Sequence, residues 1–339
     1  MVVTGANGQL GRALLSRLAE NSFRESSNDD GPETQPRIRA LVRSERAKKT
    51  IEELHLDPAP EIQIIDYTSP NQMEAALSGM RCVIHLVGII KETKGARYAE
   101  AHERTCHALA LAAQRAGIER IVYLSILGSA TSSKNECLAS KGRAERLLLE
   151  DRVPTTVLRV PMVLGGDDPA TNTLRRQARS QSVRLIDGGR TLQQPIDARD
   201  VVRAVLAACE TAPGQDLVLD AGGPECLSHR NLVLRAAKLF GNEPKIKSIP
   251  LGLARFVVRL LSAFLSEPPI TLPMFDILQH DDRTDPTFFA STLGIELTPL
   301  SKTLTDLVGH AEARPGHPPS ATTDDHQINS PEPTNEATP

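Results

Sequence analysis

Residues 4–11 read TGANGQLG, and this short stretch decides the fold. It follows an apolar run at 2–4 and opens a segment of helical spacing at 8–20. Glycines three residues apart in such a connection allow a tight turn, let the backbone approach a pyrophosphate and let helix and sheet pack closely. We therefore expect a dinucleotide-binding turn rather than an ordinary strand-to-helix turn. Its expected contact residues are Gly5, Asn7, Gly8, Leu10 and Gly11.

Short apolar and β-branched runs alternate with segments of helical spacing over the first half of the chain. The runs read as buried strands at 2–4, 38–42, 61–65, 82–87, 120–125 and 155–160. The segments between them have apolar residues three and four apart, which is typical of helices. This alternation predicts an α/β fold, a doubly wound parallel Rossmann sheet with right-handed crossovers.

The rhythm loosens after the sixth run. Shorter helices and a strand in QDLVLDAGG, 215–223, indicate a smaller C-terminal α/β lobe interleaved with the sheet. We expect one unit over 1–310, with the lobe mainly in 161–310. The polar insertion 21–36 is expected to be a mobile surface loop, and 311–339, with few large apolar residues, a disordered tail.

Charge and cysteine content exclude several classes of protein. Lys and Arg total 39 against 42 Asp and Glu, a formal net charge of −3, which argues against nucleic acid as a partner. The cysteines number 5 and form no CxxC, so we expect no disulfide framework and no metal site. No apolar run approaches the roughly 20 residues of a membrane span. We expect a cytoplasmic protein, or one of an organelle matrix if a targeting segment has been removed.

The end of the second apolar run bears on the choice of cofactor. An acidic residue there would bind the ribose 2′-hydroxyl of NAD(H). This chain has Arg43 instead, followed by Arg46, Lys48 and Lys49. A guanidinium suits a 2′-phosphate, so NADP(H) is favoured over NAD(H). The alternative is a solvated basic start to the next helix.

At this point the chain resembles a known family. The order of its motifs is similar to that of the atypical short-chain dehydrogenase/reductases, the NAD(P)-binding Rossmann proteins that include NmrA-like regulators. Within them it is most similar to the NADPH-binding accessory subunit of respiratory complex I and its bacterial relatives. The motifs are TGANGQLG, LVRS, IDYTSP, HLVGIIKE, AHERTCHALALAAQRAGIERIVYLSILG, LRVPMVLG, QQPIDARDVV and LDAGGPE.

The resemblance implies roles for residues beyond the glycine turn. It implies adenine contact near Asp66, and a family active-site serine position at Ser125. For both residues the alternative is an ordinary polar group satisfied within the fold. It also implies nicotinamide-side backbone around residue 87, a ribose contact from a lysine and a proline over the nicotinamide. The residues implied in those three roles are Leu86, Val87, Gly88, Lys141 and Pro161.

The stretch ECLASKGRAE, 136–145, departs from the active members of that family. Their YxxxK tyrosine moves a proton while the lysine holds the ribose. Here Lys141 is kept, but Cys137 stands at the tyrosine position, and a thiol side chain is shorter than a phenol. We therefore expect a mainly structural or regulatory nucleotide in a protein linked to a respiratory or quinone-related complex. The alternatives are an active NADP(H)-dependent reductase or epimerase that uses Ser125, Lys141 or water, and an NmrA-like regulator.

A second feature concerns partners. The segment LGLARFVVRLLSAFL, 251–265, predicts an amphipathic helix. One expected face has Ala254, Val257, Leu261 and Phe264, and another has Arg255 and Arg259. Such a helix would lie on a membrane surface or a protein complex, or pack against its own domain.

Overall fold

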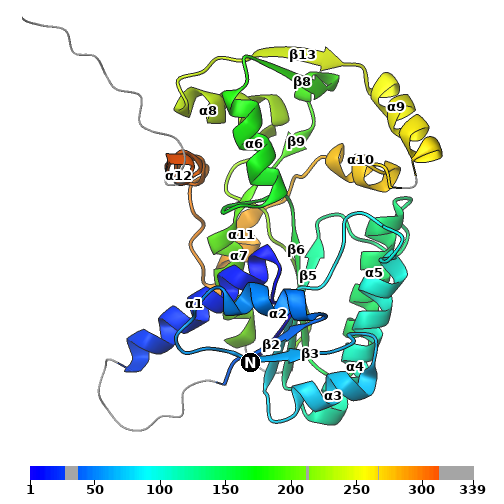
Figure 1. Cartoon of the computed structure of the whole chain (residues 1–339), viewed down its shortest axis with the longest axis vertical. Coiled ribbons are helices and arrows are strands. Elements are labelled where there is room, and N and C mark those ends of the chain that lie inside the picture. Colours follow the sequence, from blue (N-terminus) through cyan, green and yellow to red (C-terminus); the bar gives the residue numbers. More distant parts are fainter. Residues whose placement is uncertain (27–36, 211–213, 266, 313–339) are drawn as a thin grey trace, which may run out of the picture.

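The computed structural model describes residues 1–26, 37–210, 214–265 and 267–312. Its centre is a 7-stranded parallel sheet in the order β11-β6-β5-β4-β1-β2-β3 (Figure 1). The strands are β1 (Val2–Thr4), β2 (Arg39–Val42), β3 (Glu61–Ile64), β4 (Cys82–His85), β5 (Arg120–Ile126), β6 (Thr155–Val160) and β11 (Leu217–Asp220). The doubly wound Rossmann fold is thus confirmed. Its strand order reverses between β1 and β4, the place where such sheets bind ligands at their carboxyl edge.

Two helical layers cover the sheet. On one face α1 (Gln9–Ser26), α2 (Glu45–Glu52) and α7 (Ala198–Glu210) enclose one apolar cluster. On the other, α3 (Pro70–Leu77), α4 (Thr105–Ala116) and α5 (Glu136–Leu149) enclose a second. A π-helical turn, η1 (Ala99–Arg104), leads into α4. Because both faces are covered, most sheet strands are apolar on both sides, as the continuous runs in the sequence predict.

The smaller lobe has its own apolar cluster. Its main helices are α6 (Pro169–Arg179), α8 (His229–Leu239) and α12 (Leu300–Glu312). Its short strands pair as β7 (Val163–Leu164) with β10 (Ile196–Asp197), β9 (Leu192–Gln193) with β12 (Leu227–Ser228), and β8 (Ser182–Ile186) with β13 (Lys245–Ile249). The remaining helices of the described residues are η2 (Asp187–Gly189), α9 (Leu251–Phe264), α10 (Leu272–Leu278) and α11 (Pro286–Leu293).

Three boundary predictions are corrected. The strand predicted for the lobe in 215–223 is β11, which pairs in parallel with β6 and extends the central sheet. The first part of the predicted loop 21–36 is helical, because α1 continues to Ser26, and 27–36 lies outside the described residues. Helix α12 ends at Glu312, beyond the expected start of the tail, whose residues 313–339 also lie outside the described part.

Candidate functional site

The glycine turn lies where the fold requires it, between β1 and α1. Gly5 has φ +67°, a conformation that side chains with a Cβ rarely adopt, and an added Cβ would stand 3.2 Å from the carbonyl carbon of Leu86. A Cβ on Gly11 would stand 2.6 Å from the backbone oxygen of Ala6. Helix α1 therefore starts against the turn and directs its unpaired N–H groups toward the carboxyl edge of the sheet.

A tyrosine that the sequence analysis did not single out for the cofactor site braces this turn. The Gly5 N–H donates to the Tyr67 hydroxyl at 2.9 Å, and that hydroxyl donates to the Leu41 carbonyl. Burial raises the pKa of Tyr67 to about 12, while the Gly5 N–H and the nearby Arg43 guanidinium act to lower it. Tyr67 thus ties the turn to the ends of β2 and β3.

Arg12, in the first turn of α1, tests whether this place fits a dinucleotide. Its Nε atom is buried and has no hydrogen-bond partner among the described residues. A cation at a helix N-terminus opposes the helix dipole, and a buried unpaired donor is costly. A phosphate group would satisfy both, so the local chemistry fits the pyrophosphate of a dinucleotide.

The two residues expected at the adenosine end both follow strand ends. Arg43 is exposed directly after β2. Asp66 follows β3, and its Oδ1 accepts hydrogen bonds from the Thr68 N–H at 2.9 Å and the Thr68 hydroxyl at 2.8 Å. These bonds, the backbone one first, lower the pKa of Asp66. Asp66 Oδ1 is therefore hydrogen-bonded within its own loop, whereas the Arg43 side chain is exposed directly after β2.

Lys141 reaches the same edge of the sheet from α5. Its Nζ donates to the Leu124 carbonyl at 2.9 Å and to the Val87 carbonyl at 3.4 Å. A Cβ on Gly88 would stand 2.8 Å from this Nζ. Burial lowers the pKa of Lys141 to about 8. The structure thus brings together the lysine and the backbone of Val87 and Gly88, residues to which the resemblance assigns cofactor contacts.

The thiol at the tyrosine position faces protein rather than open space. Cys137 is fully buried, and its Sγ donates to the Ile89 carbonyl at 3.6 Å. Burial raises the pKa of Cys137 to about 11. Tyr98 packs beside the thiol, but its hydroxyl donates to the Ile90 carbonyl at 2.8 Å. Neither group presents an available proton next to Lys141.

Ser125 is also engaged. Its buried hydroxyl donates to Glu145 Oε1 at 2.5 Å, and Glu145 accepts from Arg159 at 2.6 Å in an ion pair. Because a carboxylate held by an arginine is a strong acceptor, the serine proton is directed into this network. Ser125 therefore serves the packing of α5 on β5 and β6 in the described structure.

Beyond β6 lies a pair of residues that sequence reasoning missed, His280 and Asp282. Pro161 follows β6 half-buried, and the N–H of the next residue, Met162, donates to the carboxylate of Asp282. Burial raises the pKa of Asp282 to about 6. His280 Nδ1 lies 3.7 Å from Asp282 Oδ1, while its Cε1 and Nε2 lie 3.4 Å from where a Cβ on Gly128 would stand. An imidazole thus sits between the ends of β5 and β6 with a carboxylate behind it.

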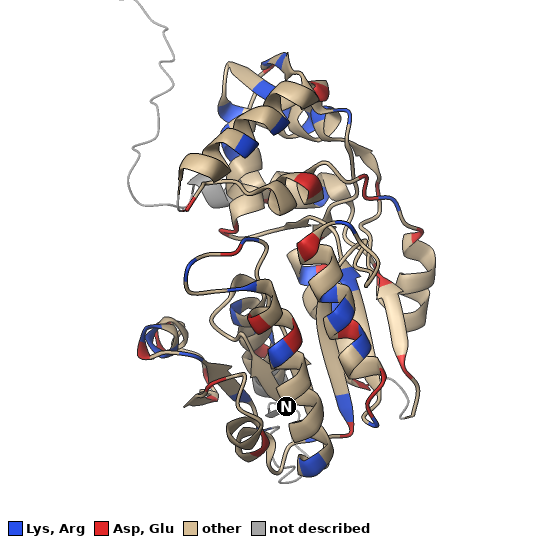
Figure 2. Cartoon of the chain, turned by 90° about the vertical axis from the view of Figure 1, so that its right-hand side faces the viewer, with Lys and Arg blue, Asp and Glu red and all other residues tan. Residues whose placement is uncertain are grey.

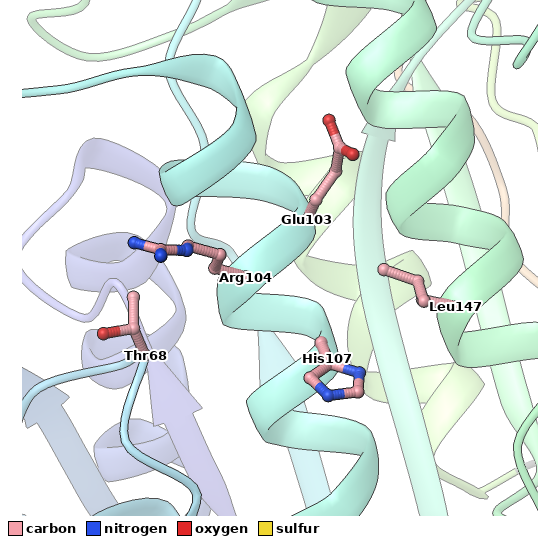
Figure 3. Close-up of a pocket in the computed structure, with 5 residues that line it drawn as sticks. All are labelled: Thr68, Glu103, Arg104, His107 and Leu147. Carbon is pink, nitrogen blue, oxygen red and sulfur yellow. The ribbon is translucent and has the colours of Figure 1, made fainter.

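A surface pocket of about 440 Å³ lies elsewhere. Figure 3 shows its lining: Thr68, Glu103, Arg104, His107 and Leu147. It opens on the outer side of α4 and includes none of the expected cofactor residues. Over the described part of the chain, no helix has both the length and the apolar character to cross a bilayer, and no cluster of His, Cys, Asp or Glu could hold a metal ion.

Comparisons with known proteins bear on the family of this chain. A family described as NAD(P)H-binding matches residues 5–212. The NADH dehydrogenase (ubiquinone) 1 alpha subcomplex subunit 9, mitochondrial, of Arabidopsis thaliana is 26% identical over 282 residues, covering 82% of this chain and 67% of that protein. The 4-hydroxy-2-methyl-3-oxo-4-farnesyl-3,4-dihydroquinoline-1-oxide ketoreductase of Stigmatella aurantiaca is 26% identical over 281 residues, covering 76% and 78%.

A solved structure gives the same answer about the fold. The triphenylmethane reductase of Citrobacter sp. superposes with a TM-score of 0.67 at 18% identity, covering 91% of this chain and 99% of that one. The resemblance to atypical short-chain dehydrogenase/reductases is thereby confirmed. Because the matched residues 5–212 span more than half of the sequence and include the glycine turn, the chain belongs to the NAD(P)H-binding Rossmann family.

Proposed function

We propose that this protein binds NADP(H) as a mainly structural or regulatory nucleotide and does not perform tyrosine-dependent hydride chemistry. The observation on which this depends is Cys137, a fully buried thiol at the place of the phenol, beside a retained Lys141. Loss of a general acid costs roughly 10² to 10⁴ in rate, whereas the binding contacts do not need it. Ser125, the other candidate proton source, donates its hydrogen bond to Glu145.

The preference for NADP(H) over NAD(H) rests on Arg43. This residue is exposed at the end of β2, and Asp66 is already bonded to Thr68. A guanidinium can make two charge-assisted hydrogen bonds to a 2′-phosphate, and such bonds are about twice as strong as neutral ones. Ser44 caps α2 directly after Arg43, which holds the chain direction at that point.

The proposed setting is a respiratory or quinone-related complex. Support comes from the Arabidopsis thaliana relative, whose name makes it a subunit of NADH dehydrogenase. In that setting the protein would stand on the cytoplasmic face of a membrane, or on the matrix face in an organelle. The nucleotide would then hold the fold in the form that the complex accepts.

The test begins with the native protein. Mass spectrometry of the purified chain should find retained NADP(H), and complex subunits should co-purify. An assay of NADPH oxidation with quinone and ketone acceptors should show turnover far below the roughly 10 s⁻¹ of a median enzyme. Ordinary turnover, or purification with no bound nucleotide and no affinity for it, would contradict the proposal.

A second candidate function is favoured by His280. Asp282 Oδ1 lies 3.7 Å from His280 Nδ1. An imidazole held in this way would donate a proton to the oxygen of a carbonyl substrate, as a general acid does. The ketoreductase relative gives this reading a precedent in name. If the chain reduces a carbonyl, His280→Gln should abolish turnover and leave NADPH affinity unchanged. His107→Gln, an exposed histidine on α4, is the matched control.

A further inference from the structure

Helix α9 (Leu251–Phe264) is apolar on the side that faces away from the protein. Among the described residues, Val258 is the buried member of this helix, and α10 is the helix that packs most closely against it. Its exposed apolar side chains are Leu251 at 42%, Leu253 at 55%, Phe256 at 61%, Val257 at 43%, Leu260 at 47% and Phe264 at 80%. In Figure 1 the helix lies at the outer edge of the smaller lobe, far from the glycine turn.

The exposed residues form one stripe. Residues 253, 256, 257, 260 and 264 follow the i, i+3, i+4, i+7 and i+11 spacing of a single helical face. The sequence predicted a different apolar face, with Val257 and Phe264 beside Ala254 and Leu261. The structure corrects it, because the inner face centres on Val258 and leaves Val257 and Phe264 in solvent. The outward stripe is therefore unpartnered among the described residues.

The charged residues of this helix are all basic. Residues 251–265 include two arginines and no acidic residue. Arg255 pairs with Asp276 at 2.7 Å, while Arg259 has no acidic partner among the described residues. Exposed Lys245 and Lys247 precede the helix on β13. Figure 2, turned to show this side, has Lys and Arg on this end of the molecule. The chain as a whole has a net charge of −3, so the basic character is local.

We propose that α9 binds a negatively charged lipid surface, lying along it with the stripe inserted and Arg259 at the headgroups. An apolar face with a basic edge is the composition of interfacial helices. At 1.5 Å per residue the helix would cover about 21 Å of the surface without spanning it. Acidic phospholipid is the favoured occupant because it supplies both things that this surface needs. Its headgroups give diffuse negative charge for Arg259, Lys245 and Lys247, and its acyl layer gives apolar depth for the stripe.

Contacts through α10 connect α9 to the start of α5. Helix α9 packs on α10, and the Pro273 carbonyl of α10 accepts a hydrogen bond from Asn135 Nδ2 at 2.8 Å. Asn135 caps α5, the helix of Cys137 and Lys141. Lys91 Nζ donates to the Pro268 carbonyl at 2.8 Å between the two helices. The membrane proposal does not depend on what the nucleotide does, and these contacts join the proposed membrane-binding helix to the start of α5.

The experiment is vesicle flotation with the full-length protein. Vesicles of phosphatidylglycerol and phosphatidylcholine are compared with phosphatidylcholine alone, at about 0.1 M and about 1 M salt. Wild type should float with the anionic vesicles, with binding reduced on neutral vesicles and at high salt. Phe256→Ser and Phe264→Ser should each lower the partition constant about tenfold. Arg259→Gln should lower it about fivefold on anionic vesicles only.

Phe288→Ser is the matched control, because Phe288 is 64% exposed on α11, close to the 61% of Phe256. It should float like wild type. Circular dichroism and thermal unfolding check that each variant is folded. The proposal is overturned if wild type stays with the free protein, or if Phe288→Ser loses as much binding as Phe256→Ser. It is also overturned if wild type elutes as a dimer that Phe256→Ser dissociates, since a second copy would then cover the stripe.

Discussion

The glycine turn and the start of α5 lie at the same carboxyl edge of the sheet, yet only the glycine turn matches the family pattern in full. At the turn, Gly5 and Gly11 have the tight backbone approach typical of a dinucleotide-binding turn, and Tyr67 braces it. At the start of α5, Lys141 remains but Cys137 is closed in by Ile89. The proposed function therefore separates binding from proton transfer, because the two would depend on different residues at this edge of the sheet.

The largest expected effect tests the binding side. Gly11→Ala puts a Cβ 2.6 Å from the Ala6 backbone oxygen, which cannot move without shifting β1. We expect the free energy of unfolding to fall by about 3 kcal/mol, with loss of NADPH binding by calorimetry. Gly95→Ala is the control, since a Cβ there meets nothing within 4 Å. Equal stability and affinity in both variants would break the comparison at its first member.

The next expected effect, of about the same size in free energy but without loss of binding, is the pH dependence of stability that Lys141 causes. The folded pKa is lowered to about 8 from 10.5, so the folded state loses its proton first as pH rises. The unfolded state then binds more protons, and stability increases with pH through this window. Relative to Lys141→Met, wild type should gain about 3 kcal/mol between pH 7 and pH 10.5 in chemical unfolding.

The control for this measurement is Lys134→Met, which removes an exposed lysine just before α5. Its difference from wild type should not change with pH. If Lys141→Met behaved in the same way, Lys141 would be hydrated rather than buried. Its role as a preserved part of a closed site would then be wrong.

Much of this was readable from the sequence, and the failures have physical causes. The glycine spacing and the continuous apolar runs specify local conformation and burial, so the parallel sheet followed from them, whereas the roles of Lys141 and Gly88 came from the family resemblance alone. The strand β11 was assigned to the lobe because a short apolar run does not encode its pairing partner. The order of strands along the chain does not tell that β11 pairs with β6 at the edge of the central sheet.

Other residues were missed because their partners are distant in sequence. His280 meets Gly128, which is 152 residues earlier in the sequence, only after the lobe folds back on β5 and β6, whereas Asp282 is two residues away. The acidic run that follows it, at 281–282, was the one signal available. Ser125 was assigned to the active site by position, whereas its contact with Glu145, 20 residues later, decides where its proton points. Side-chain direction is not a property of a motif.

A moderate effect sharpens the adenosine side of the comparison. Arg43→Asp should weaken NADPH binding by about 2 kcal/mol, because it removes a charge-assisted contact to the 2′-phosphate. Affinity for NADH should change little or improve. Calorimetry with both nucleotides measures this directly, and NADH serves as the internal control. Equal affinities of wild type for NADPH and NADH would remove the proposed preference.

The smallest expected effect concerns Cys137 itself. Cys137→Ala deletes one buried sulfur atom, so the free energy of unfolding should fall by only about 1 kcal/mol. NADPH affinity and any residual turnover should not change, because the thiol is bonded to the Ile89 carbonyl and its pKa is raised to about 11 by burial. Cys226→Ala, at an exposed cysteine, controls for thiol reactivity. Turnover that disappeared in Cys137→Ala alone would make the thiol the proton donor, and the separation of binding from chemistry would fail. Turnover that survived it and disappeared in His280→Gln would keep that separation and move the acid to the lobe.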